Sequence, residues 1–306
     1  MSNPEVMSKH KENQWSNYAL RIILNTASHP FEYAKILIQI GHEPIAPRPS
    51  KTFFGNPTLK LPNIFQYVKH INNVDGFAGL YTGLAPKVCG SLLSAIAVEK
   101  CTEYLKLSKL EDLDDEEDTE ELRKHKFLNS LACDLINHTA AIAISQPFHV
   151  ITIRMMAQFV GKETKYMGIF DSVKEIYHQN GILGFFSGLM PRLLGDILTL
   201  LLAGCLTYTI NRYLVKEKEL QLYTATTMNF ISTTVMYPFQ VVSTCMAVSN
   251  SGLLVGSPPF MPHYKTWMEC WINLSRHKQL KRGSSVLVRY YTGPSITVGG
   301  KLLPVH

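Results

Sequence analysis

Ionisable and amide side chains recur at helical spacing inside segments that are otherwise apolar. Between residues 16 and 40 they are separated by three or four positions, which places them on one face of a helix. This first stripe comprises Arg21, Asn25, His29, Glu32, Lys35 and Gln39. Because a charge at the centre of a bilayer costs at least ~2.5 kcal/mol, we expect the stripe to face a hydrated interior.

Four further segments carry similar stripes. Their members are Lys87, Ser91 and Ser94; Asp134, His138, Ser145, His149 and Thr152; Arg192, Asp196 and Thr199; and Thr226, Asn229, Thr233, Tyr237, Gln240 and Thr244. Together with Arg154, these residues are candidates for lining one shared polar groove along which a hydrated segment could pass beside lipid. Dry polar packing between helices is the alternative for any single residue.

Local pairing offers a simpler role for two sets of charges. Glu32 and Lys35 lie one helical turn apart and could neutralise each other. Arg192 and Asp196 have the same relation. If these groups are not paired locally, they set the charge of the groove.

Residue sets typical of catalysis or cofactor binding are absent from the sequence. His138 and His149 share a helix face with Asp134, but a structural zinc site needs four ligands. The six cysteines are widely spaced and form no C-x-x-C pair, which argues against zinc and disulfide scaffolds. Phosphate-binding, dinucleotide-binding and nucleophile-elbow motifs are also missing. We therefore expect no enzyme, no cofactor and no metal.

Five segments are long enough to carry the stripes across a bilayer. They span approximately residues 16–40, 84–106, 127–157, 189–214 and 222–248. A soluble protein with long buried helices is the alternative, but the stretch 197–207 has no polar face. Only 18% of the 306 residues are charged, 46% are hydrophobic, and the net charge of +6 is spread along the chain. This composition excludes a disordered chain and a nucleic-acid-binding surface.

An internal repeat relates two parts of the chain. Residues 75–87 match residues 180–192 at a constant offset of 105 positions, with glycines, an aromatic residue and a proline in register. The match begins at Asp75-Gly76 and Asn180-Gly181, and it ends at Pro86-Lys87 and Pro191-Arg192.

Prolines mark the first, third and fifth long segments at equivalent places. Pro30, Pro147 and Pro238 are each followed by phenylalanine. A proline inside a helix removes a backbone hydrogen bond, so we expect three kinked helices. An amphipathic segment follows each kink, at residues 61–73, 168–179 and 264–277, and we expect these segments to lie on the membrane surface.

The order Pro-x-[Asp/Glu]-x-x-[Lys/Arg], amphipathic segment and aromatic-x-Gly-x-x-Pro resembles the mitochondrial solute carrier family. The resemblance implies an all-α integral membrane protein of three repeats around a central cavity that opens and closes to exchange solutes. We divide the single membrane domain 1–306 into repeat one (1–107), an acidic loop (108–122), repeat two (123–216) and a truncated repeat three (217–306).

The chain departs from the family pattern in two ways. In a working carrier, the acid and base after each proline form a ring of ion pairs that closes the cavity. Only the first repeat keeps both groups; the corresponding pairs are Glu32 and Lys35, His149 and Thr152, and Gln240 and Ser243. After residue 283 the tail is rich in glycine and proline, so we expect five transmembrane helices, with the sixth missing.

These departures, together with the sequence of residues 181–198, resemble the mitochondrial carrier homolog branch of the family. That resemblance implies a location in the mitochondrial outer membrane and a role as an insertase for tail-anchored and other α-helical membrane proteins. It also implies docking of truncated Bid, so the expected partners are membrane lipids, client helices and truncated Bid, with no nucleic acid. The alternatives are a pure docking receptor and a divergent small-solute transporter that uses His149, Arg154 and Gln240.

Three remaining segments carry less information. Residues 111–121 contain nine acidic residues and are expected to form a solvated loop. Residues 41–61 contain four prolines and two glycines and are expected to be irregular. Residues 1–14 show neither a secretory signal nor an amphipathic presequence.

Overall fold

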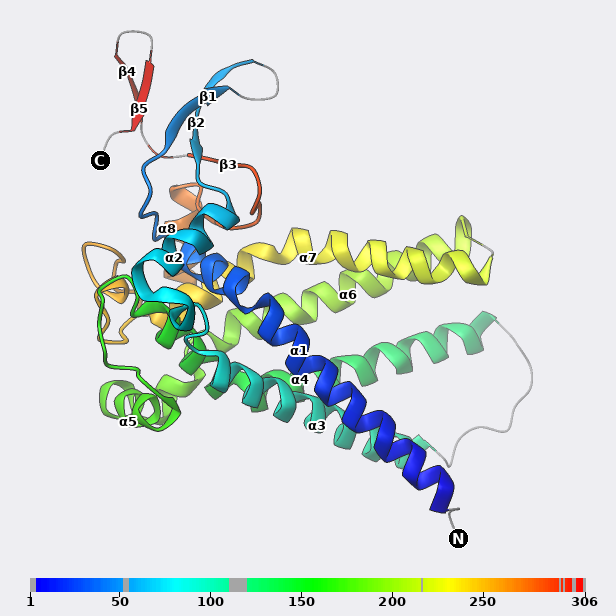
Figure 1. Cartoon of the computed structure of the whole chain (residues 1–306). Coiled ribbons are helices and arrows are strands. Elements are labelled where there is room, and N and C mark those ends of the chain that lie inside the picture. The colour runs from blue at the N-terminus through cyan, green and yellow to red at the C-terminus, as the bar shows by residue number, and fades with distance from the viewer. Residues whose placement is uncertain are drawn as a thin grey trace.

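The structure is a computed structural model that describes the backbone of residues 4–51, 55–109, 120–215, 217–291, 293, 295–298 and 301–304 (Figure 1). The helices are α1 (Pro4–Gln39), α2 (Ile64–Gly79), α3 (Leu84–Lys109), α4 (Glu120–Ala157), α5 (Ile169–Asn180), η1 (Ile182–Phe186), α6 (Leu189–Tyr213), α7 (Lys218–Val248), η2 (Leu254–Gly256) and α8 (Trp267–Arg276). The strands are β1 (Arg48–Lys51), β2 (Pro57–Leu61), β3 (Arg289–Tyr290), β4 (Ser295–Val298) and β5 (Lys301–Pro304). Most of the predicted acidic loop lies outside the described residues.

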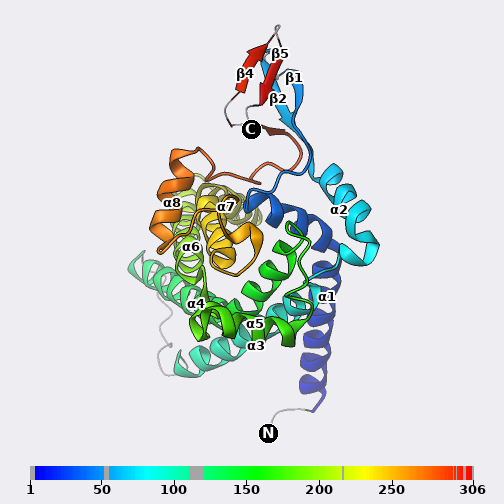
Figure 2. The same ribbon diagram turned by 90° about the vertical axis from the view of Figure 1, so that its left-hand side faces the viewer.

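Five long helices form the body of the molecule, at the places where five long segments were predicted. α3 packs along α4, α6 packs along α7, and α4 joins the two pairs through its contacts with α6. α1 lies against α3 and α4 and touches α7 near its own C-terminal end. Figure 2 shows the short helices α2, α5 and α8 around the periphery of the end where α1, α4 and α7 finish. We call this end of the molecule the closed end.

Apolar length differs among the five helices. Within the described residues, Lys124–Ala157, Ile182–Tyr213 and Leu220–Val248 are long and apolar enough to span a membrane. A fourth span, Ile64–Gly79 with Leu84–Leu105, passes only as a pair bent by 81°. α1 does not pass, because charged and amide residues recur along it. The five predicted helices are therefore present as long helices. Three of them, or four if the bent pair counts as one span, are long and apolar enough to cross a membrane.

The hydrophobic core gathers at the closed end. The C-terminal parts of α1, α4 and α7 are buried against one another and against residues of α2, α5 and α8. Each of the three long helices continues through its proline, and α1 changes direction visibly along its length (Figure 1). Towards their N-terminal ends, α1 and α7 instead expose large apolar side chains such as Ile23 and Phe230. One end of the bundle is thus packed, while the other presents apolar surface suited to lipid.

The predicted repeat is visible in the backbone. Gly76 and Gly181 have φ angles of 73° and 63°, and Gly83 and Gly188 have φ angles of 83° and 74°. Each motif therefore makes the same two left-handed turns between a surface helix and the next long helix. A Cβ added at Gly188 would lie 2.5 Å from the carbonyl oxygen of Ser243, so this turn packs directly on α7.

Small sheets form in the 41–61 segment, which was expected to be irregular, and in the tail after residue 283. β1 and β2 form an antiparallel hairpin, and β2 also pairs with β3, so that residues near the C-terminus join the loop after α1. β4 and β5 form a separate hairpin. The prediction of an irregular 41–61 segment was wrong for Arg48–Lys51 and Pro57–Leu61, which pair with each other as a local hairpin. Arg289–Tyr290 adds a second, non-local partner to the end of β2. Between residues 277 and 304, the described part of the chain contains no helix.

Candidate functional site: a polar groove with a lateral opening

A cavity of about 680 Å³ lies between α1, α4, α6 and α7. Its polar lining includes eleven residues of the predicted groove or its stripes: Glu32, Lys35, Gln39, His149, Arg192, Asp196, Thr199, Thr233, Tyr237, Gln240 and Thr244. A second chamber of about 180 Å³, lined also by α3, shares Glu32, His149 and Arg192 with the first. We refer to the two adjoining cavities as the groove.

The acid that opens the first-repeat motif has a partner on another helix. Glu32 forms an ion pair with Lys87 of α3, and the Lys87 ammonium also lies 3.5 Å from the carbonyl oxygen of Asn25. Lys35 is left without an ion pair within 4 Å among the described residues, and its Nζ lies 5.2 Å from the ring centroid of Tyr237. The predicted local pair of Glu32 and Lys35 therefore does not form. Lys35 instead remains as a cation that faces the groove beside the ring of Tyr237.

The opposite wall carries a second cation and an acid. Arg192 donates to Oε1 of Gln146 at 2.8 Å, while Asp196 lies one helical turn along α6 and lines the same cavity. The described residues show no ion pair within 4 Å between Arg192 and Asp196, so the predicted local pair does not form. His149 lies at the junction of the two chambers. The groove therefore presents separated positive and negative groups instead of a neutral patch.

The groove continues towards the open end of the bundle. A further cavity of about 1020 Å³ lies between α4, α6 and α7, and its lining includes Asp134 and Asn229. His138 is exposed and lies close enough to Asp196 for an electrostatic interaction. Arg21 is exposed on the N-terminal half of α1. These predicted residues form an outer, more open part of the polar surface.

Two predicted groove residues lie elsewhere. His29 is fully buried, with Nε2 3.0 Å from the carbonyl oxygen of Thr82 and its ring stacked on Tyr81. Arg154 is also fully buried, near the end of α4. His29 has the stripe spacing of α1, but its ring contacts the turn that precedes α3. Arg154 lies off the stripe of α4, two positions after Thr152, and makes packing contacts at the closed end.

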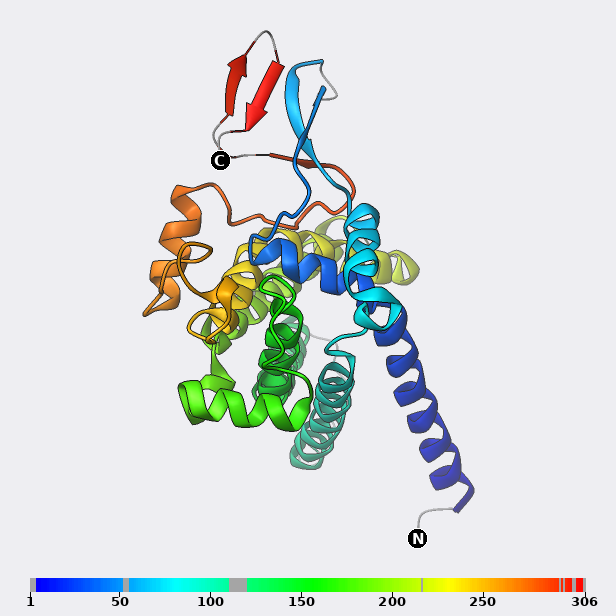
Figure 3. The ribbon, with the colours of Figure 1, turned by 60° about the vertical axis from the view of Figure 1, so that its left-hand side comes forward.

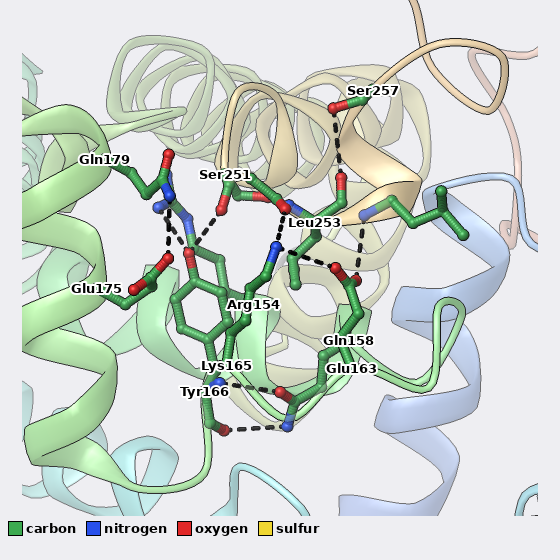
Figure 4. A network of polar contacts seen from close by, with 12 residues as sticks. Arg154, Gln158, Glu163, Lys165, Tyr166, Glu175, Gln179, Ser251, Leu253 and Ser257 are labelled. Carbon is green, nitrogen blue, oxygen red and sulfur yellow. Dashed lines mark hydrogen bonds and ion pairs between the residues drawn. The ribbon is translucent and has the colours of Figure 1, made fainter.

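Arg154 belongs to a polar network that closes the end of the bundle (Figure 4). Its Nε donates to the carbonyl oxygen of Ala247 at 3.0 Å, and Nη1 lies 3.4 Å from the hydroxyl of Tyr166. That hydroxyl donates to the carbonyl oxygen of Ser251 at 2.7 Å, and burial raises the pKa of Tyr166. A cation in the last turn of α4 also complements the partial negative charge of the helix end. Arg154 therefore ties α4 to the end of α7.

The residue before each kink proline makes an equivalent contact in all three repeats, a feature missed by our sequence analysis. His29 contacts the carbonyl oxygen of Thr82, Gln146 donates to that of Ser187 at 2.9 Å, and Tyr237 donates to that of Arg282 at 2.8 Å. In every case the residue that carries the accepting carbonyl is followed by a glycine with positive φ, namely Gly83, Gly188 or Gly283. The third repeat thus keeps the inner geometry of the other two as far as Gly283.

The degenerate gate positions make backbone contacts instead of a ring of charges. The hydroxyl of Thr152 donates to the carbonyl oxygen of Phe148, and that of Ser243 donates to the carbonyl oxygen of Gly188, each at 2.8 Å. Small side chains at these positions allow the turn of one repeat to pack on the long helix of the next. Lys35 is the one cation left at the three base positions.

The groove is closed at one end, and α1 and α7 separate from each other towards the other end. At the closed end, Gln39 of α1 donates to the hydroxyl of Tyr237 at 2.9 Å and accepts from Thr244 of α7 at 3.0 Å. Nearer the open end, α1 diverges from α7 (Figure 3), and its described side-chain bonds join it to α3. The apolar residues Phe31 and Val286 line the cavity at this seam. Polar groove and apolar surface therefore meet between α1 and α7.

Repeated long helices with a central polar cavity define a carrier-type membrane protein. The family model of mitochondrial carrier proteins matches residues 19–109 and 123–218. Mitochondrial carrier homolog 2 of Mus musculus is 40% identical over 274 residues, which cover 87% of this chain and 90% of that protein. Mitochondrial carrier homolog 2 of Homo sapiens is 39% identical over the same shares, and mitochondrial carrier homolog 1 of Mus musculus is 35% identical over 89% of this chain and 75% of that protein. The chain belongs to the mitochondrial carrier family and, within it, to the mitochondrial carrier homologs.

Proposed function

We propose that this mitochondrial membrane protein is an insertase of the outer membrane that guides tail-anchored and other α-helical membrane proteins into the bilayer. The observation that carries the proposal is the groove between α1, α4, α6 and α7, which is lined by polar side chains and closed at one end, while α1 and α7 diverge towards the other end (Figure 3). We propose that a client reaches lipid where these two helices diverge. Placement in the outer membrane is part of the proposal.

A groove of this shape suits a client with two kinds of surface. The polar end of a client must leave water, and an unsatisfied polar group in hydrocarbon costs several kcal/mol. Charged and hydroxyl side chains along the groove would keep that end hydrated. The apolar helix of the client would meanwhile pass sideways between the N-terminal halves of α1 and α7 into lipid.

Solute transport is the alternative function, because the groove is large enough for a small molecule. Transport by alternating access requires the closed end to open. Two of the three charged pairs that would form a reversible gate are absent, and Arg154, expected as a substrate contact, is buried outside the groove. These features favour insertion over exchange.

Charge reversal inside the groove tests the proposal. Purified wild type, Lys35→Glu and Asp196→Arg would be reconstituted in liposomes, and protease-protected insertion of a tail-anchored client would be measured against empty liposomes. We expect wild type to insert the client above the baseline and the two variants to shift the yield several-fold, because both charges face the groove. Lys174→Glu and Asp171→Arg, on exposed residues of α5, are matched controls expected to behave as wild type.

Insertion no better than with empty liposomes would overturn the insertase function. Saturable solute exchange by the same proteoliposomes would then support the transporter, while binding of truncated Bid without either activity would support a docking receptor. Unchanged insertion by both folded groove variants would overturn the groove as the active surface.

A further inference from the structure

One seam of the bundle has no even-numbered helix to close it. Repeats one and two each end in a long helix, α3 or α6, that packs along the first long helix of the next repeat. Repeat three reaches Gly283, whose backbone lies against Ile38 and Gln39 of α1, but the described chain after it does not turn into a helix. The contact between repeat three and repeat one must therefore be made by other means.

Residues 282–291, which we call the strap, make this contact. The strap begins at α7, where the carbonyl oxygen of Arg282 accepts from Tyr237 at 2.8 Å. It then crosses α1 and reaches the start of α2, where the amide of Ile64 donates to the carbonyl oxygen of Val286 at 2.9 Å. It ends beside β2, where the amide of Tyr291 donates to the carbonyl oxygen of Leu59 at 2.9 Å.

An ion pair between a buried arginine and a partly exposed glutamate anchors the strap to repeat one. Arg289 is 7% exposed, forms an ion pair with Glu43 and donates to the carbonyl oxygen of Pro62 at 3.0 Å. Glu43 lies just beyond α1, while Arg289 is about 246 positions away in sequence. Removing one partner of such a pair leaves a buried charge without compensation, so the contact resists opening.

The strap covers a seam that is already joined at its inner side. Beneath it, Gln39 bridges Tyr237 and Thr244, and the thiol of Cys245 lies 3.5 Å from the carbonyl oxygen of Gln39. Val286 of the strap also lines the groove. The strap is thus placed between the groove and the surface of the closed end.

We propose that the strap permanently joins repeat three to repeat one at the closed end, in place of a sixth helix, so that the groove does not open to water there. Most of its bonds go to backbone groups, and its one ion pair holds the buried guanidinium of Arg289, whereas a gate built to cycle would use charges that separate readily. This role is independent of what the groove carries. It explains how a chain with a degenerate ring of ion pairs keeps one end sealed.

Cys245 provides a native reporter for the seal, because its side chain is 1% exposed at this seam. In a background where the other five cysteines are alanine, we would measure labelling of Cys245 by a water-soluble maleimide and leakage of a small dye from proteoliposomes. We expect slow labelling and no leakage for the parent. Arg289→Glu should raise both, and Glu43→Arg with Arg289→Glu should restore most of the protection.

Arg276→Glu, at an exposed position at the end of α8, controls for the change of charge and should match the parent. If Arg289→Glu does not fold, Tyr237→Phe removes the hydroxyl contacts with both Arg282 and Gln39 without touching the ion pair, and it should also raise labelling of Cys245. A folded Arg289→Glu or Tyr237→Phe protein with parental labelling and no leakage would overturn the proposal. A folded charge-swap variant that stays as open as Arg289→Glu would overturn the ion pair as its anchor.

Discussion

At the scale of single residues, burial and partner choice decide what a polar side chain does. Glu32 and Lys35 have the spacing of a local pair, yet Glu32 bonds to Lys87 and Lys35 remains in the groove beside Tyr237. The ion pair between Glu32 and Lys87 holds α1 and α3 together. A local pair of Glu32 with Lys35 would instead have left Lys87 as the unpaired cation. The charge of the groove therefore depends on α3 as much as on the repeat motif.

His42 gives a residue-scale prediction for pH. It follows α1, lies edge-on to Phe159 with 6.0 Å between ring centroids, and has its pKa lowered to about 4 by burial, with a further contribution from His70. An unfolded histidine titrates near pH 6.5, so between pH 6.5 and 4 the unfolded chain binds a proton that the folded chain does not. The free energy of unfolding should therefore fall as pH drops through this range.

Thermal unfolding in detergent at pH 7 and pH 5 would measure this effect. His42→Phe keeps an aromatic ring but cannot take up a proton, so it should lose less stability than wild type on acidification. His178→Phe, on an exposed residue of α5, is the matched control for removal of an imidazole. Equal losses in wild type and His42→Phe would contradict the prediction.

At the scale of elements, the turn before each even-numbered helix sets how consecutive repeats pack. Gly83 approaches the carbonyl oxygen of Thr152, and Gly188 approaches that of Ser243. A hydrogen bond from the residue before the kink proline fixes each turn from inside the same repeat. The position of α3 or α6 is therefore coupled to the kink of the helix that precedes it.

Alanine substitutions at two glycines distinguish the cost of backbone strain from the cost of crowding a neighbouring helix. Gly181 and Gly188 both have positive φ, but a Cβ at Gly181 would meet open space, whereas at Gly188 it would lie 2.5 Å from Ser243. Gly181→Ala should lower the free energy of unfolding by about 1–3 kcal/mol, because a φ of 63° with a ψ of −158° is adopted almost only by glycine. Gly188→Ala should cost about 1–3 kcal/mol more, because α6 must shift away from α7. Denaturant unfolding in micelles would measure both, and equal losses would contradict the packing explanation.

At the scale of the whole molecule, the arrangement is a bundle joined at one end and divided at the other. The buried core and the strap unite the three repeats at the closed end. On the N-terminal side of the kinks, α1 follows α3 while α7 follows α6, so we expect the groove to be reached both from the open end and through the seam between α1 and α7. A chain with a sixth helix at this seam would cover the lateral opening.

Quenching of site-specific fluorophores would test this shape. Labels at Ser28 and Thr233, which line the groove from α1 and α7, should be quenched both by aqueous iodide and by doxyl-labelled lipid. A label at Ile136, 49% exposed and about opposite Asp134 on α4, should respond to the lipid quencher alone. Protection of Ser28 and Thr233 from either quencher would contradict a groove that is both wet and laterally open.

The sequence by itself determined the class of fold, the repeat and the long helices, because these depend on periodicity and on local backbone chemistry. Apolar length, polar stripes, the three kink prolines and the glycines with positive φ are all encoded within short segments. Much of the polar lining was also predictable, because residues such as Glu32, His149 and Asp196 lie at stripe spacing on one face of their helices.

Only the tertiary structure decided which polar residues leave the groove and how the third repeat closes. His29 and Arg154 make packing contacts with other segments of the chain, which no single stripe reveals. The pairing of Arg289 with Glu43 and of β3 with β2 joins residues more than 200 positions apart. Such contacts depend on the position of every intervening helix, and that is the physical reason why the strap could not be predicted from the sequence.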